Sequence, residues 1–278
     1  IYYGSGTQLL SSAKIMDGQQ IASAHSMYVM NEGIANSTTI NSGGCMNIES
    51  GGTANNARVE NGGYLYISSG GTANNTRVEN GGYLYVNSGG TANIVFNPWQ
   101  GTVESYSGAV IIYQRDVNIY YGCQSSGLIS SADIMNELQI TSGCSAVIYE
   151  GGVADSTTIN SGGYLCISSG GTANSTTVSS GGYMYIGVGG TATNVNWTPC
   201  IGRVQEEDGA TVTYASKYSG VYFGSSDQLL SHTQSMTEKI VSGDMYVMSD
   251  GEANSTTVSS RGRLYIFNGG VANSTTVN

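Results

Sequence analysis

Residues 64–86 read YLYISSGGTANNTRVENGGYLYV, and the run that starts at Tyr64 starts again 19 residues later at Tyr83. Tyrosine alternates with Leu65 and Ile67, the period of two that places aliphatic side chains on one face of a β-strand. Pairs of glycine separate this strand from its neighbours and favour tight turns. Strands this short cannot bury an apolar face alone, so the repeat predicts coils that stack and close a common core.

The 19-residue register extends over most of the chain. Glycine recurs with this spacing at positions 33, 52, 71 and 90, at 152, 171 and 190, and at 251 and 270. Between the main strands, Ala73, Thr76 and Val78 face inward if the chain bends once. An apolar column keeps the same register: Val29, Ile48, Ile67, Val86, Ile148, Ile167, Ile186, Val247 and Ile266. We therefore predict an all-β protein, a single-stranded right-handed parallel β-helix (β-solenoid) with 19-residue coils.

A longer repeat lies over the short one. The run Ile-Tyr-Tyr-Gly at residues 1–4 returns at 119–122, and Val-Tyr-Phe-Gly at 221–224 starts a third copy. We expect three solenoid modules, at residues 1–118, 119–219 and 220–278, the third truncated, forming one continuous rod.

Two insertions interrupt the register. Val78 is followed after 25 residues by Val103, and Val178 after 26 residues by Val204. Loops on a rigid scaffold commonly carry recognition, so both are candidate binding loops. The alternative is a module joint whose tryptophan covers the edge of the core. The candidate binding residues are Asn97, Pro98, Trp99, Gln100, Asn196, Trp197, Thr198 and Pro199.

Charge and composition exclude several classes of protein. The net charge is −10 and only nine residues are Lys or Arg, which argues against nucleic acid as a partner. No run of apolar residues is long enough for a membrane-spanning helix, so we expect no membrane insertion by this segment. The five cysteines lack CxxC spacing and are expected to be mainly free apolar fillers, with one or two disulfides left open.

Catalytic, cofactor-binding and metal-binding residues are not expected. His25 and His232 have no nucleophile at a fixed spacing, and the calcium-binding string GGxGxD is absent. The acidic run at 206–208 is interpreted as a soluble edge. Glu60 and Glu79 alternate with arginines and are interpreted as cross-strand ion pairs. The rival hypothesis, a polysaccharide lyase or hydrolase, predicts a groove that holds two or more carboxylates.

Polar and aromatic ladders are expected on the outside of the coils. Tyrosines are predicted to stack as Tyr64 with Tyr83, Tyr28 and Tyr66 with Tyr85, Tyr164 with Tyr183, and Tyr246 with Tyr265. Asn36, Asn55, Asn74 and Asn93 are predicted to exchange amide hydrogen bonds between coils. Structural stabilisation is the preferred interpretation of both ladders. The tyrosines could also hold a carbohydrate ring or dock another rod.

The units at residues 36–44 (NSTTINSGG) and 164–178 (YLCISSGGTANSTTV) resemble the repeat of AIDA-type autotransporter passengers. The resemblance covers roughly 170 residues and recurs in every module. It implies a right-handed β-helix on the bacterial surface that acts as an adhesin and self-associates. The five cysteines and the Trp-Pro loops depart from the simple repeat.

The resemblance also implies O-glycosylation with heptose on Ser and Thr of the repeat. The implied acceptors form two predicted columns: Ser37, Ser156, Ser175, Ser255 and Ser274, and Thr39, Thr158, Thr177, Thr257 and Thr276.

We therefore expect an extracellular or surface-exposed bacterial repeat protein, a structural or adhesive rod without a cofactor. Its partners would be copies of itself, or a host or bacterial surface glycan or protein. A phage-fibre-like solenoid is a further alternative, which trimeric assembly would reveal.

Overall fold

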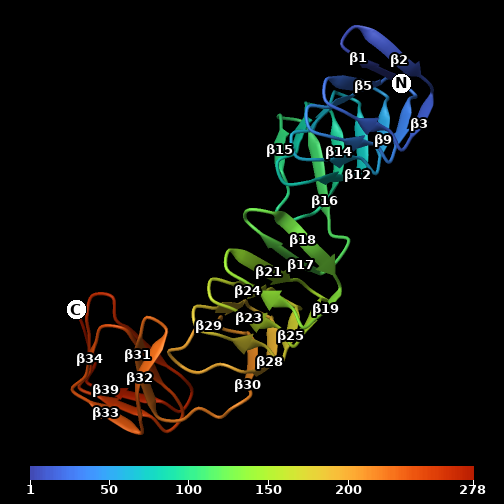
Figure 1. Ribbon diagram of the computed structural model, residues 1–278. Coiled ribbons are helices and arrows are strands. Elements are labelled where there is room, and N and C mark those ends of the chain that lie inside the picture. Colours follow the sequence, from blue (N-terminus) through green and yellow to red (C-terminus); the bar gives the residue numbers. More distant parts are fainter. The chain divides into compact units, whose positions relative to one another are not determined.

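The computed structural model describes all residues, 1–278, and contains strands and turns but no helix. No segment therefore forms a helix of the length and hydropathy that a membrane crossing needs. The chain forms two compact units, Ile1–Ser130 and Ser131–Asn278, which are described separately (Figure 1). The predicted fold class, an all-β parallel β-solenoid with 19-residue coils, is confirmed in both units.

In the first unit, one sheet holds the long strand of every coil, in the order β15-β13-β11-β8-β5-β1-β2. Its strands are β1 (Tyr2–Ser5), β2 (Gln8–Ser12), β5 (His25–Val29), β8 (Cys45–Ile48), β11 (Tyr64–Ile67), β13 (Tyr83–Val86) and β15 (Thr102–Ser105). A second sheet holds β3 (Ile15–Asp17), β4 (Gln20–Ile21), β6 (Ile34–Asn36), β7 (Thr39–Ile40), β9 (Thr53–Asn55), β10 (Arg58–Val59), β12 (Thr72–Val78), β14 (Thr91–Val95) and β16 (Val110–Gln114). The strands β17 (Ile119–Cys123) and β18 (Gly127–Ala132) follow as neighbours in one sheet.

The second unit repeats this arrangement twice. Its first stack comprises β19 (Ile134–Asn136), β20 (Gln139–Ile140), β21 (Cys144–Ile148), β22 (Val153–Asp155), β23 (Thr158–Ile159), β24 (Tyr164–Ile167), β25 (Thr172–Asn174), β26 (Thr177–Val178), β27 (Tyr183–Ile186), β28 (Thr191–Val195), β29 (Arg203–Glu206) and β30 (Thr211–Tyr214). Its second stack comprises β31 (Val221–Ser225), β32 (Gln228–Thr233), β33 (Ser235–Thr237), β34 (Ile240–Val241), β35 (Asp244–Val247), β36 (Glu252–Asn254), β37 (Thr257–Val258), β38 (Arg263–Ile266), β39 (Val271–Asn273) and β40 (Thr276–Val277). The two stacks form separate sheets.

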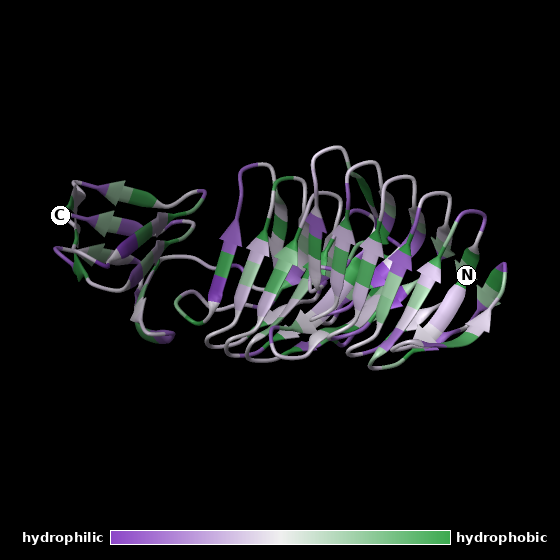
Figure 2. Ribbon diagram, turned by 90° about the horizontal axis from the view of Figure 1, so that it is seen from above, coloured by the Kyte–Doolittle hydropathy of each residue, from purple (hydrophilic) through white to green (hydrophobic).

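Equivalent side chains lie above one another because the coils have equal length. In β11 and β13, Tyr64 pairs with Tyr83 and Leu65 with Leu84, as the 19-residue spacing predicts. The column of Ile48, Ile67 and Val86 is fully buried, and hydrophobic bands recur at matching positions of successive strands in Figure 2. Each coil therefore covers the apolar side chains of its neighbour.

The bend between the two short strands of each coil is a residue in the left-handed region. Asn75 has φ +52°, so Ala73, Thr76 and Val78 all point into the core, as the sequence predicts. Ser175 makes the same bend at φ +54°. The next residue of the coil is often a buried threonine whose hydroxyl has no hydrogen-bond partner, at Thr38, Thr76, Thr157, Thr176 and Thr256.

We predict that Thr176→Val stabilises the second unit. The hydroxyl of Thr176 is buried without a partner, and Val195 occupies the equivalent position in the next coil. Replacing an unsatisfied hydroxyl by a methyl group of the same shape is expected to add about 1 kcal/mol to the free energy of unfolding. Denaturant unfolding measures this change. A variant at the exposed neighbour Ser175 is the matched control and is unfolded in the same way. A Thr176→Val protein less stable than the parent would contradict the prediction.

The recurrent tyrosine-glycine motif departs from the predicted parallel stacking. It forms the first strand of a hairpin: β1 pairs antiparallel with both β2 and β5, and β31 pairs antiparallel with both β32 and β35. The register of each hairpin shifts at its glycine, Gly4 or Gly224. A Cβ atom at either glycine would collide with the backbone of the second hairpin strand. The segments at residues 1–12 and 221–233 are therefore hairpins rather than regular coils, and the division into three modules stays a prediction.

The expectation that the cysteines are mainly free thiols holds for three of the five. Cys45, Cys166 and Cys200 are free thiols, whereas Cys123 and Cys144 are disulfide-bonded. Burial raises the pKa of the Cys200 thiol to about 12. That thiol is therefore un-ionised at neutral pH, and its environment disfavours thiolate chemistry.

Candidate functional site

The first insertion loop packs onto the hairpin strand that follows it. The side chain of Asn97 accepts a hydrogen bond from the backbone nitrogen of Trp99 at 2.9 Å, which fixes the turn. A Cβ atom at Gly122 of β17 would lie only 2.8 Å from the ring of Trp99. Asn97 is buried, and Pro98, Trp99 and Gln100 are half-buried. The loop therefore covers the glycine of the next tyrosine-glycine motif.

The second insertion loop makes the equivalent contact with β31. Cys200 stands where Trp99 stands in the first loop, and a Cβ atom at Gly224 would lie 3.0 Å from its Sγ atom. Trp197 is only 1% exposed and Pro199 is buried, while Thr198 is half-buried and Asn196 is exposed. Both loops thus pack against the strand that follows them, which favours the alternative interpretation of the insertions. Ligand binding by these eight residues stays a prediction.

Trp197 is the centre of an aromatic cluster in the second unit. Its ring centroid lies 5.7 Å from that of Tyr214, 6.1 Å from that of Tyr218 and 5.3 Å from that of Tyr246. Tyr218 also meets Tyr222 edge to face at 6.2 Å. These contacts hold the end of β30 and the segment after it against the coils of the last module.

A groove of about 610 Å³ lies beside this cluster, entirely within the second unit. Tyr214, Tyr218 and Phe267 supply its aromatic lining. Glu206, Lys217, Asp250 and Asn268 supply charged and amide groups, together with Ser216, Ser219, Ser249, Val212 and Met248. We call this hollow the aromatic groove. Aromatic faces beside a few polar groups are typical of a site for a small or extended ligand.

Burial changes the electrostatics of the aromatic groove. Loss of contact with water raises the pKa of the Glu206 carboxyl, and burial likewise raises the pKa of the Tyr214 hydroxyl. Both groups therefore hold their protons more strongly than in water, which favours hydrogen bonding over charge. The prediction for residues 206–208 treated Glu206 as a soluble edge. Its place in the groove was not foreseen, because β30 and the last module meet only in the folded chain.

The acidic pair of the first unit shares one arginine. Glu60 and Glu79 both bind Nε of Arg58, at 2.9 and 3.1 Å, beside a hollow of about 300 Å³. Arg77 pairs instead with Asp116. The predicted ion pairing between coils is therefore present for Arg58 with Glu79, whereas Glu60 binds the arginine of its own coil. Because Arg58 holds both carboxylates, the hollow offers no free pair of carboxyl groups for a glycosidase mechanism.

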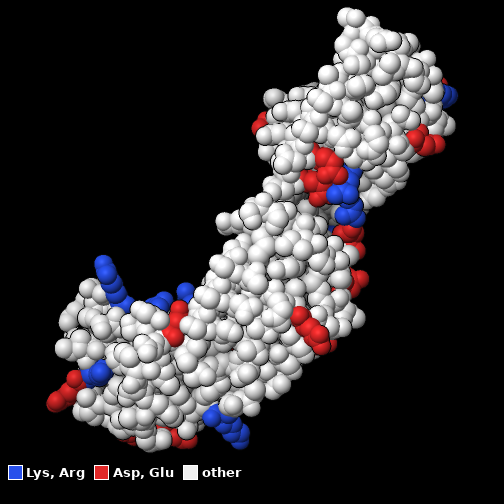
Figure 3. Space-filling view, viewed as in Figure 1, with Lys and Arg blue, Asp and Glu red and all other residues white.

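No group of three or more His, Cys, Asp or Glu side chains is placed to hold a metal ion. His25 stacks on Tyr3, and His232 stacks on Tyr222 at 3.9 Å between ring centroids. Most of the visible surface in Figure 3 carries no charge, which agrees with the 10% of residues that are charged.

The tyrosine ladders form at the predicted positions with one correction. Ring centroids are 5.0 Å apart for Tyr64 and Tyr83 and 5.1 Å apart for Tyr66 and Tyr85. Tyr246 and Tyr265 also stack, at 4.7 Å, and the rings of Tyr164 and Tyr183 lie 5.1 Å apart with a tilt of 40°. Tyr28 does not join Tyr66, because Asn47 occupies the coil between them.

The asparagine ladder connects successive coils. The Nδ2 atoms of Asn55, Asn74 and Asn93 each donate to Oδ1 of the asparagine one coil earlier, at 2.9 to 3.0 Å. Asn273 donates in the same way to Asn254 at 2.9 Å. Because each amide is satisfied by its neighbour, the ladder stabilises the stack and leaves few of these groups for a partner.

Comparison with known proteins identifies the repeat. A family model described as "AIDA: Adhesin of bacterial autotransporter system, probable stalk" matches residues 47–95 and 137–198. Within these two ranges the coils match the AIDA stalk repeat. The resemblance found in the sequence is thereby confirmed over those residues, which lie in the first unit and in the first stack of the second unit.

Among solved structures, the TibC-catalysed, hyper-glycosylated fragment of TibA is similar to this chain. The two are 26% identical, and the match covers 96% of this chain and 90% of that chain with a TM-score of 0.27. A TM-score this low carries no structural argument. No curated protein sequence matches the chain.

Proposed function

We propose that this chain is the adhesive stalk of a bacterial surface protein of the autotransporter type. The observation that carries the proposal is the match of its 19-residue coils to the AIDA adhesin stalk family. Stacked coils held by apolar columns and amide ladders suit a stalk, because each coil is stabilised by its neighbours. The function is structural and adhesive rather than enzymatic, and the protein acts at the cell surface or outside the cell.

We propose a carbohydrate as the partner of the aromatic groove. Tyr214, Tyr218 and Phe267 offer apolar ring faces, and Asp250 and Asn268 offer hydrogen-bonding groups to hydroxyls. This combination suits a sugar ring, which has apolar faces and a polar rim.

The experiment is binding of the full chain to a panel of immobilised bacterial and host surface glycans. We expect Tyr218→Ala to weaken binding to the recognised glycan about tenfold or more, the loss of one aromatic contact of about 1.4 kcal/mol. Tyr106→Ala is the control, because Tyr106 is 58% exposed and does not line the groove. Unchanged binding by a folded Tyr218→Ala protein would refute the groove as the site.

Self-association is tested separately by analytical ultracentrifugation over a wide range of concentrations. Growth of large species with concentration is the expected result, since many weak contacts add along stacked repeats. A protein that is monomeric throughout and binds no glycan would remove the adhesive part of the proposal. A stable trimer would favour the phage-fibre-like alternative.

We further propose that any O-glycosylation falls on the serine column of the AIDA repeat. Ser37, Ser156, Ser175, Ser255 and Ser274 are all exposed at left-handed bends. The threonine column is less accessible, with Thr39, Thr158, Thr177 and Thr257 half-buried and Thr276 exposed. Mass spectrometry of protein from its natural source should find sugar on Ser175 and none on the buried Thr176. Sugar confined to the threonine column would contradict this order.

A further inference from the structure

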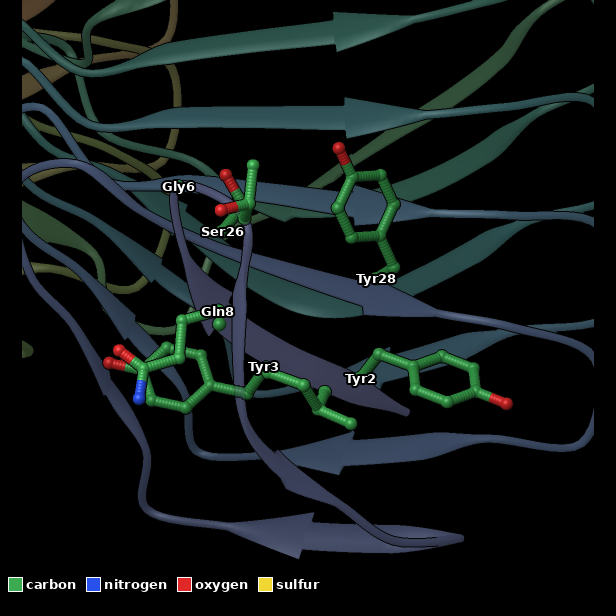
Figure 4. A pocket seen from close by; sticks show the side chains of 9 residues that line it. Tyr2, Tyr3, Gly6, Gln8, Ser26 and Tyr28 are labelled. Carbon is green, nitrogen blue, oxygen red and sulfur yellow. The ribbon is translucent and has the colours of Figure 1, made fainter.

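The first hairpin carries a pocket of about 230 Å³ that the proposed function does not use. Tyr2, Tyr3 and Tyr28 lie along it (Figure 4), and Gly4 and Leu9 also line it. Its lining also includes Gly6, Thr7, Gln8 and Ser26, so no charged side chain is present. We call this hollow the hairpin pocket.

The equivalent hairpins of the other modules have no such open face. Tyr2 is 52% exposed, whereas its equivalents Tyr120 and Tyr222 are 1% and 7% exposed. Tyr28 is 46% exposed, whereas its equivalent Tyr246 is 3% exposed. The tyrosine-glycine motif is therefore covered by other residues in its second and third copies and exposed in the first.

The insertion loops cover the two closed hairpins. Trp99 lies on Gly122, the equivalent of Gly4, and Cys200 lies on Gly224. The segments around the loops cover the tyrosines: Phe96 meets Tyr120 edge to face at 5.8 Å, and Trp197 meets Tyr246 at 5.3 Å. The hairpin pocket occupies the place where these loops lie in the other modules.

We propose that the hairpin pocket is the receiving half of a module joint. Its occupant is the Phe-Asn-Pro-Trp-Gln-Gly type of loop, as at residues 96–101, carried by a module of this kind placed in tandem ahead of Ile1. The loop is uncharged, as is the pocket. A second copy of the chain is a poorer occupant, because both of its loops already lie on their own hairpins, at Gly122 and Gly224.

The test places an additional copy of residues 1–118 ahead of Ile1 in the full chain, which reproduces the natural junction of Asn118 with an isoleucine. Exposed tyrosines are nitrated with tetranitromethane and quantified by peptide mass spectrometry. We expect nitration of the original Tyr2 and Tyr28 to slow by about fivefold or more, since covered groups react only on local opening. Tyr2 of the added copy should react at the rate of the parent chain, and Tyr120 should stay slow throughout.

The matched control is the same fusion with Trp99→Ala in the added copy, in which we expect most of the protection to be lost. A synthetic peptide, IVFNPWQGTV (residues 94–103), is a second probe that does not depend on folding of the added module. We expect it to slow nitration of Tyr2 in a saturable way, and its Trp99→Ala form to have no effect. The proposal is overturned if neither probe protects Tyr2, if the alanine forms protect equally, or if the parent chain protects its own Tyr2 as concentration rises.

Discussion

Alanine at Gly182 will destabilise the second unit by about 3 kcal/mol, because added volume has no room in a closely packed turn. A Cβ atom at Gly182 would lie 2.5 Å from the carbonyl oxygen of Ile159 in the preceding coil. Backbone from one coil passes directly over the other here, so neither group can move without breaking hydrogen bonds of the stack. The same close approach recurs in the first unit at Gly44, Gly63 and Gly82.

Gly187 in the same coil provides the control. A Cβ atom there would lie 3.3 Å from the nearest atom, and equivalent coils carry Ser68, Asn87 and Ser168 at this position. Gly187→Ala is expected to leave the free energy of unfolding within about 0.5 kcal/mol of the parent value. Thermal and denaturant unfolding of the two variants measure the difference. Equal stability of the two variants would show that the coil can accommodate a side chain at position 182, and would contradict the prediction.

Trp197→Ala will cost about 3 to 5 kcal/mol, the usual range for removing a buried tryptophan. Trp197 is 1% exposed and contacts three tyrosines that join the two stacks of the second unit. Its Nε1 atom has no hydrogen-bond partner, so the ring contributes through packing alone. Trp197→Phe, which keeps an aromatic ring in place, is therefore expected to lose less than half as much.

Loosening of this joint has a second readout in the thiol of Cys200. Cys200 is buried and un-ionised in the parent protein, so it should react slowly with iodoacetamide. In Trp197→Ala the rate should rise by about tenfold or more, as local opening exposes the thiol. The half-buried thiols of Cys45 and Cys166 serve as references in the same sample. Parent-like stability together with unchanged Cys200 reactivity would contradict the packing role of Trp197.

The regular coils could be predicted closely from the sequence. Leu65 and Ile67 are buried while Tyr64 and Tyr66 are outside, because a strand alternates its side chains and the 19-residue spacing repeats that choice. The bend that turns Thr76 inward was also predictable, since Ala73 and Val78 could not otherwise share a face. The asparagine ladder was predictable as well, because asparagine recurs at the same position of successive 19-residue coils.

The candidate site was less accessible to such reasoning. The sequence marks Trp197 as unusual but does not say whether it is exposed for a ligand or buried in a joint. Glu206 and Phe267 are far apart in the chain, and no repeat relates them. The direction of β1 and β31 was also missed, because a strand at the start of a module has no periodic predecessor from which its partner can be read.

Periodicity alone decided the class of fold, the length of each coil and which side chains point inward, because equal spacing forces equal residues into contact. Only the tertiary structure decided in which direction β1 and β31 pair, how the insertion loops close on the next hairpin and where an aromatic groove is left open. Those features depend on contacts between segments that are related by no repeat, so their geometry follows from packing rather than from pattern.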